Sequence, residues 1–136
     1  MNRFRRAVLA PMLALALAGG AAAQEEPIAP VPAELPPPIY EDKLLRLAEI
    51  LGSLSFLRDL CGDDDGSAWR TEMSTLLAAE EPGPQRRQRL VASFNHGFET
   101  FNAVYRSCTP SAKRAIGRYL TEGEALAGDV RTRYSQ

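Results

Sequence analysis

The sequence predicts an all-α protein, a small four-helix up-down bundle with one disulfide, preceded by a signal peptide and a proline-rich linker. From residue 39 onward, apolar residues recur every three or four positions in four separate segments, which is the spacing of amphipathic helices. No segment alternates apolar and polar residues as a strand does. The two cysteines, Cys61 and Cys108, fall at the C-terminal ends of the first and third helical segments. In an alternating bundle these ends lie at the same pole, so their sulfur atoms can bond.

Each predicted helix has one main apolar side. The first helix spans about residues 40–60 and ends before Gly62, and its stripe comprises Leu44, Leu47, Ala48, Leu51, Leu54 and Cys61. The second spans 67–80, with Trp69, Met73, Leu76 and Leu77. The third spans 84–107 and carries Leu90, Val91, Phe94, Phe98, Phe101, Val104 and Tyr105. The fourth spans 110–134 and follows Thr109, a typical N-cap residue, with Pro110 in its first turn.

The first 23 residues have the pattern of a cleavable signal peptide. Arg3, Arg5 and Arg6 precede an apolar segment at residues 7–18, and three alanines at residues 21–23 fit a cleavage site. We therefore expect export, with cleavage after about Ala23. An uncleaved anchor is the alternative, although the apolar segment is too short to span a bilayer comfortably. No cysteine stands at the cleavage site, so we expect no lipid anchor and no stable membrane attachment.

Residues 24–38 contain six prolines and lack apolar periodicity. Such a composition favours the extended polyproline II conformation and provides no core. We expect a disordered linker here, and a ligand for a proline-binding partner is the alternative. The helical domain then comprises residues 39–136.

The charge balance argues against some classes of partner. The whole chain has a formal net charge of −1, and the predicted signal peptide contains three arginines and no acidic residue, so the exported part carries about −4. Binding to nucleic acid or to anionic lipid requires a basic surface, so we expect neither as a partner. Two cysteines in an exported chain also favour a disulfide over two free thiols.

Basic residues crowd the first turns of two predicted helices, where they oppose the helix dipole. They are Arg86, Arg87 and Arg89 in the third helix, and Lys113 and Arg114 in the fourth. A patch that binds an anion or a partner is one interpretation. A solvated helix face is the other, and the shortness of both clusters favours it.

The acidic loop after the first helix is the candidate for metal binding. Aligned with a calcium-binding EF-hand loop, Asp63, Asp65 and Glu72 fall at ligand positions three, five and twelve. Position one is Cys61, which is no calcium ligand once it forms a disulfide. A solvated acidic turn, favourable at the N-terminus of the second helix, is the alternative. A small-ligand or calcium-binding function through this loop, with Asp64 included, is the second functional hypothesis.

No residue pattern indicates catalysis. His96 is the only histidine in the sequence, and we expect it to face solvent because it lies away from the apolar side of its helix. No serine stands in a G-x-S-x-G context, and no glycine-rich loop is suited to a phosphate. We identify no catalytic residue and no cofactor, and an enzyme is the least supported function.

The first predicted helix is apolar on two sides, which is the strongest indication of function. Leu45, Phe56 and Leu60 lie roughly opposite its main stripe, where a surface helix is normally polar. Such a helix is either central or covered by the proline-rich segment, a second copy or a partner. The leading hypothesis is a non-enzymatic interaction or structural module that binds an envelope protein or itself. A second candidate surface comprises Asn95, Phe98 and Asn102.

Three segments carry a resemblance to a known family. They are YEDKLLRLAEILGSLSFLRDLCG (Tyr40 to Gly62), Trp69-Arg70, and RLVASFNHGFETFNAVYRSCTPSAKRAIGRYLTEG (Arg89 to Gly123). The elements LCG, FN-x-G-[FY] and Y-R-x-C-T occur in them together and in order. In these segments the chain resembles an uncharacterised family of small exported α-proteobacterial helical proteins, a domain of unknown function. The resemblance implies a periplasmic helical protein of about this size and supplies no activity.

Overall fold

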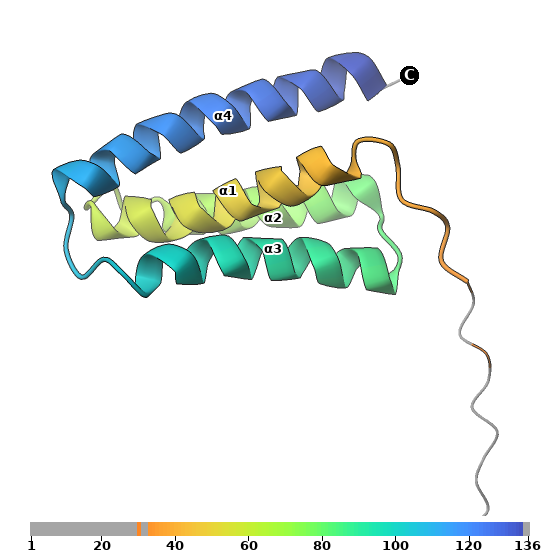
Figure 1. Cartoon of the computed structure of the whole chain (residues 1–136), viewed down its shortest axis with the longest axis horizontal. Helices are drawn as coiled ribbons and strands as arrows, with labels where there is room; N and C mark the ends of the chain where they lie inside the picture. Colours follow the sequence, from red (N-terminus) through yellow and green to blue (C-terminus); the bar gives the residue numbers. More distant parts are fainter. Residues whose placement is uncertain (1–29, 31–32, 135–136) are drawn as a thin grey trace, which may run out of the picture. The chain divides into compact units, whose positions relative to one another are not determined.

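The computed structural model describes residue 30 and residues 33–134, apart from the side chains of residues 133 and 134. The predicted signal peptide and most of the predicted linker lie outside the described residues. The chain divides into two units, residues 1–31 and 32–136, and the described helices all belong to the second. They are α1 (Glu41–Leu60), α2 (Gly66–Glu80), α3 (Pro84–Asn102) and α4 (Pro110–Tyr134) (Figure 1). No strand occurs among the described residues, in agreement with the all-α prediction.

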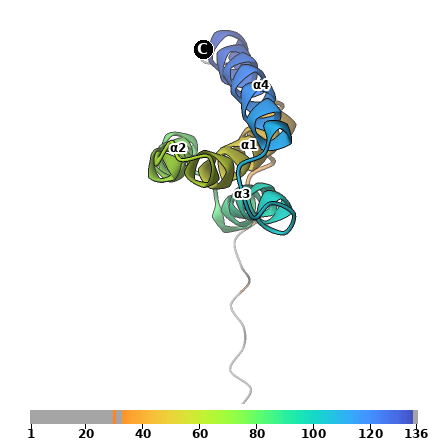
Figure 2. The same cartoon turned by 90° about the vertical axis from the view of Figure 1, so that its left-hand side faces the viewer.

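The helices form a bundle in which α1 is central. Successive helices run in opposite directions, as predicted (Figure 1). The prediction left open whether the first helix, which is apolar on two sides, is central or is covered by another segment or a partner, and the structure shows that it is central. α1 packs against α2, α3 and α4, whereas these outer helices touch one another at most marginally. Seen from the end, α1 lies in the middle with the outer helices on three of its sides (Figure 2).

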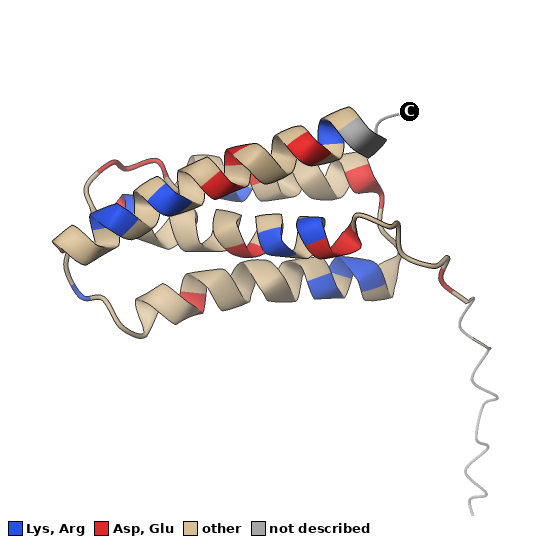
Figure 3. Cartoon of the chain, turned by 45° about the horizontal axis from the view of Figure 1, so that its top comes forward, with Lys and Arg blue, Asp and Glu red and all other residues tan. Residues whose placement is uncertain are grey.

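α1 takes the central place because its apolar residues are not confined to one side. Residues 50–55 are all buried, and six consecutive residues point in all directions around a helix axis. None of these six side chains is charged, and a helix segment without a charged side is suited to a place inside a protein core. By contrast, charged residues are spread along α4, which lies at the surface (Figure 3). The two apolar sides of the first helix therefore reflect its central position.

α1 and α3 approach each other closely through two glycines. Gly52 of α1 faces the backbone of α3, where a Cβ atom would overlap the carbonyl oxygen of Phe94. Gly97 of α3 faces α1, where a Cβ atom would overlap the carbonyl oxygen of Glu49. Both glycines are buried. The lack of a side chain at these two positions therefore sets the distance between the two helix backbones.

Replacing either glycine with alanine should destabilise the protein. Gly52→Ala and Gly97→Ala each force the helices apart, which should lower the free energy of unfolding in urea titrations by about 1–3 kcal/mol. Gly117→Ala is the control, because a Cβ atom there meets nothing within 4 Å. That variant should be stabilised by about 0.5–1 kcal/mol through its higher helix propensity. Equal changes in the free energy of unfolding at all three positions would contradict the close approach of α1 and α3.

Two apolar clusters lie on different sides of α1. The first joins α1 to α2 and α3 and contains Leu44, Ala48, Leu51, Met73, Leu77 and Leu90. The second joins α1 to α4 and contains Ile50, Leu54, Leu57, Ala112, Ala115 and Ile116. α2 thus packs on α1 mainly through the first cluster and α4 mainly through the second, while Trp69 of α2 packs against both.

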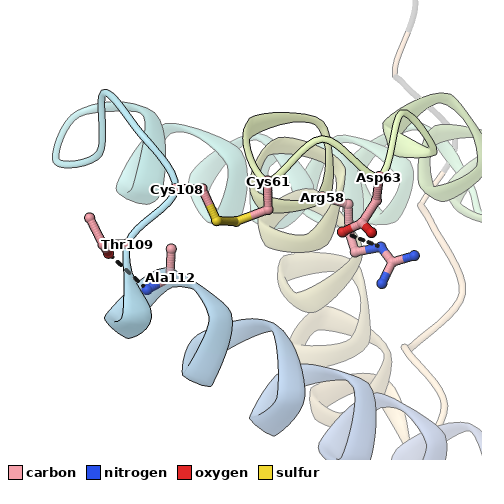
Figure 4. Close-up of a disulfide and its surroundings, with 6 residues drawn as sticks. All are labelled: Arg58, Cys61, Asp63, Cys108, Thr109 and Ala112. Carbon is pink, nitrogen blue, oxygen red and sulfur yellow. Dashed lines mark hydrogen bonds and ion pairs between the residues drawn. A yellow bond between two sulfur atoms is a disulfide. The ribbon is translucent and has the colours of Figure 1, made fainter.

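The predicted disulfide between Cys61 and Cys108 is present, with a Cα–Cα distance of 4.8 Å (Figure 4). Cys61 directly follows α1, and Gly62 then leaves the helix with a φ of 81°. Cys108 precedes Thr109, whose Oγ1 accepts a hydrogen bond from the backbone N–H of Ala112 at 3.1 Å, so the predicted N-cap is confirmed. The disulfide thereby holds the start of α4 against the end of α1. A cross-link of this loop length stabilises a chain by about 4 kcal/mol on entropic grounds.

α3 ends at Asn102, whereas the apolar pattern predicted a helix to residue 107. The chain turns at Ala103 and Val104 and continues without helical structure to the disulfide. Val104, expected on the apolar side of the helix, is 71% exposed. The apolar pattern predicted too long a helix, because a helix continued to residue 107 would carry Cys108 away from Cys61. The chain has to uncoil to bring the two sulfur atoms together.

Residues 33–38 have no regular secondary structure, yet they contact the helical domain. The carboxylate of Glu34 accepts hydrogen bonds from the backbone N–H groups of Gln85 at 3.0 Å and Arg86 at 2.9 Å, in the first turn of α3. The N-cap residue of α3 is Gly83, which has no side chain to fill this role. A residue of the predicted linker therefore caps a helix 51 residues further along the chain.

Candidate functional site

The basic start of α3 lies beside the acidic start of α1 (Figure 3). Arg86 is only 8% exposed and donates hydrogen bonds to Glu41 of α1 at 2.5 Å and to Glu80 of α2. Arg89 lies 3.7 Å from the other carboxylate oxygen of Glu41. Arg86 thus joins three helices through a buried ion-pair cluster. The prediction that it lies on a solvated helix face is therefore wrong. The sequence held no signal for this cluster, because Glu41 is 45 residues away.

The acidic loop connects the end of α1 to the start of α2. Asp65 accepts hydrogen bonds from Nη2 of Arg58 at 2.5 Å and from the indole N–H of Trp69 at 3.1 Å. Asp63 lies 3.6 Å from Nε of the same guanidinium group (Figure 4). Glu72 is exposed on α2 and does not join these contacts. Among the side chains that the structure describes, no group of three or more His, Cys, Asp or Glu residues could hold a metal ion. Calcium binding by this loop stays a prediction.

The ion pair between Arg58 and Asp65 should make stability depend on pH. The hydrogen bonds from Arg58, assisted by that from Trp69, lower the pKa of Asp65. Such a carboxylate stabilises the fold above its unfolded pKa of about 3.9, and this contribution is lost as the pH falls through the folded pKa. Asp65→Asn should therefore lower the melting temperature by a few degrees at neutral pH, and the difference should vanish once the pH lies below the folded pKa of Asp65.

Thermal melts between acidic and neutral pH measure this effect, with Asp64→Asn as the control. Asp64 is an exposed carboxylate in the same loop, so its variant should follow the wild-type curve. A loss of stability in Asp65→Asn that is the same at every pH would show that the charge of Asp65 is not what stabilises the loop.

The apolar residues proposed as an interaction surface on the first helix lie largely against the chain itself. Phe56 packs edge-to-face on Phe98 of α3, with the ring centroids 5.4 Å apart. Leu45 and Leu60 are half-buried, and Leu45 lines a small hollow together with the end of the proline-rich segment. This side of α1 is therefore used mainly for packing within the chain.

The second proposed surface lies along one edge of α3. Asn95 is exposed there, and Asn102 is half-buried, with its amide donating a hydrogen bond to Glu99 at 3.2 Å. His96 is exposed on the same helix, as expected. Phe98, the third residue of this surface, packs its ring against Phe56 of α1.

An elongated apolar groove lies between α2 and α4, with α1 as its floor. Its volume is ≈ 790 Å³. α2 and α4 form the two walls because they stand on different sides of α1 (Figure 2). α1 contributes only aliphatic side chains to the floor, namely Leu44, Leu47, Ile50, Leu51 and Leu54. The groove follows directly from the central position of α1, and we define it as the α2–α4 groove.

The walls of the α2–α4 groove combine aromatic, aliphatic and small side chains. α2 contributes half-buried Trp69 and Leu76 together with exposed Ala68, Thr75 and Ala79. At Gly123 of α4, a Cβ atom would lie 3.3 Å from Cγ2 of Ile50, so α4 approaches the floor closely there. The other apolar residues that α4 contributes are Tyr119, Leu120, Ala127 and Val130.

Polar contacts fix the position of α4 along α1. Arg46 of α1 donates hydrogen bonds to Glu122 of α4 through Nε at 2.7 Å and through Nη2 at 2.9 Å. Its guanidinium carbon also lies 5.4 Å from the ring centroid of Tyr119. Lys43 and Asp129 form a further ion pair between the two helices. α4 is thus held to α1 along its length as well as at the disulfide.

The charged residues of the α2–α4 groove are mostly acidic. Asp65 and Glu80 are already paired with arginines that do not line the groove. Glu72 of α2 and Glu124 of α4 are exposed, and neither has an ion-pair partner among the described residues. Arg131 is the basic residue of the described lining. The groove therefore has an apolar interior and a carboxylate on each wall.

These features define a small disulfide-bonded helical protein with a central helix and an apolar groove. Residues 38–134 match the family DUF2385, which is described as a protein of unknown function. The chain belongs to this family, as the resemblance to an uncharacterised helical family predicted. No match was found among curated proteins or among solved structures. Of the helices in the described part of the chain, none has the length and apolarity needed to span a membrane.

Proposed function

We propose that this protein is a non-enzymatic interaction module of the α-proteobacterial periplasm, which binds an apolar segment of an envelope protein in the α2–α4 groove. The observation that carries the proposal is the groove, whose floor consists entirely of aliphatic side chains. Apolar hollows of this size are typical of binding sites, because filling them removes apolar surface from water.

The disulfide supports a location outside the cytoplasm. Disulfides form and persist in oxidising compartments such as the periplasm, and they are rare in the cytosol. The bond between Cys61 and Cys108 links the end of α1 to the segment that leads into α4, so its reduction would remove one of the links between these two helices. The signal-peptide pattern of residues 1–23 agrees with export, although those residues lie outside the described part of the chain.

The lining of the groove favours binding over catalysis. An active site brings together groups that can attack a bond or transfer a proton. Here the lining consists mainly of leucine, alanine and aromatic residues. Its carboxylates are spread along the walls, with Asp65 at the start of α2, Glu72 and Glu80 eight residues apart on α2, and Glu124 on α4. His96 is on α3, outside the lining.

Photo-cross-linking in living cells tests the proposal. We expect p-benzoylphenylalanine at position 75, on the groove wall, to capture a partner protein upon irradiation. The control is the same residue at position 74. Thr75 and Ser74 are neighbouring exposed residues of α2, but only Thr75 lines the groove.

Two results would count against this function. One is an equal yield of adducts at positions 74 and 75, or none at position 75, because either would mean that the groove is not where the partner binds. The other is retention of the protein in the cytoplasm after osmotic shock, which would exclude an envelope partner.

A further inference from the structure

We propose that the α2–α4 groove accepts an amphipathic α-helix that carries lysine or arginine on its polar side. This inference rests on the proposed function and adds the shape and the charge of the bound segment. Three features of the groove support it: its length, the small residues along its walls, and the two carboxylates that have no ion-pair partner in the described part of the chain.

The groove is long and follows the axes of its own helices. Its α2 wall extends from Asp65 to Glu80, which corresponds to about 22 Å at 1.5 Å per residue. Its α4 wall extends from Tyr119 to Arg131, or about 18 Å. A helix of roughly 14 residues has this length. Helices bound in such grooves insert apolar residues spaced at i, i+3, i+4 and i+7, which matches an elongated apolar floor.

Small side chains occur where a bound helix would meet the walls. Ala68, Thr75 and Ala79 are exposed and lie on one side of α2, at helical spacing. Ala127 is a small residue of the α4 wall, and Gly123, four residues before it, lets α4 approach Ile50 of the floor. The glycine pair between α1 and α3 shows that this protein uses small residues to bring helix backbones close together. The walls thus leave room for a further helix backbone, where larger side chains would fill the hollow.

The acidic residues on the walls of the groove indicate a basic occupant. Glu72 and Glu124 stand on opposite walls and have no ion-pair partner among the described residues. The long stems of lysine and arginine let an amphipathic helix bury its apolar side while its charged ends reach these carboxylates. Arg131 lies seven residues beyond Glu124, toward the end of the wall, so the middle of the groove is acidic. An acidic helix or a fatty acid would be repelled there.

Synthetic peptides of about 14 residues test the inference on the purified, disulfide-bonded protein. All have leucine on one side of a helix, and the other side carries lysine, glutamate or neutral serine. Trp69 is the single tryptophan of the chain and lines the groove, so its fluorescence reports occupancy. We expect the lysine peptide to shift the Trp69 emission saturably and to become helical by circular dichroism. The glutamate peptide should bind about tenfold more weakly.

Two variants test the role of the free carboxylates. Glu72→Gln and Glu124→Gln should each weaken binding of the lysine peptide by about twofold to fivefold and leave binding of the serine peptide unchanged. Both residues are exposed, so we expect unchanged thermal melts. Glu99→Gln is the control, because Glu99 is an exposed carboxylate on α3 outside the groove lining, and this variant should bind like wild type.

The outcomes separate this inference from the proposed function. Equal affinity for the lysine and glutamate peptides would overturn the inferred charge and leave the groove as an apolar binding site. If no peptide shifts the Trp69 emission, the helical occupant is overturned, while cross-linking at position 75 still decides the proposed function. Self-association that Thr75→Phe abolishes and Ser74→Phe preserves would mean that a second copy of the chain fills the groove, and would overturn the basic-helix occupant.

Discussion

The packing of α1 against all three other helices is the constraint on which the rest of the structure depends. α3 covers α1 most closely, because Gly52 and Gly97 allow the two backbones to meet. α2 covers another side of α1 mainly through one apolar cluster, and α4 covers a third side mainly through the other. The three outer helices do not close around α1, and the space between α2 and α4 becomes the groove. The candidate binding site is thus a consequence of how three helices share the surface of a fourth.

Links at both poles fix this arrangement, because hydrophobic burial alone is non-directional. At one pole the disulfide holds the start of α4 against the end of α1. At the other pole Arg86 joins Glu41 and Glu80, and Glu34 caps α3. A buried ion-pair cluster of this kind adds little net stability, but losing one member leaves an uncompensated buried charge. We interpret the cluster as a device that sets the relative positions of α1, α2 and α3.

Much of the fold could be predicted from the sequence because it depends on local patterns. Helical periodicity gave the four helices, and the positions of Cys61 and Cys108 at two helix ends gave the disulfide. The groove could not be predicted, although Trp69 and Leu76 were recognised as apolar. A periodic stripe shows that a helix has an apolar side, but not whether another helix covers all of it. The contacts of Arg86 and Glu34 were likewise missed, since their partners are distant in sequence and meet only in the folded chain.

Hydrogen exchange of the backbone amides, followed by NMR on the native protein with increasing denaturant, tests the central position of α1 most directly. The amides of residues 50–57 should be among the slowest, exchanging only when the whole domain unfolds, because α1 is covered on several sides. The amides in the second half of α4, which packs mainly on α1, should exchange faster through local opening. Equal protection of α1 and of the second half of α4, or fast exchange within residues 50–57, would contradict a structure organised around α1.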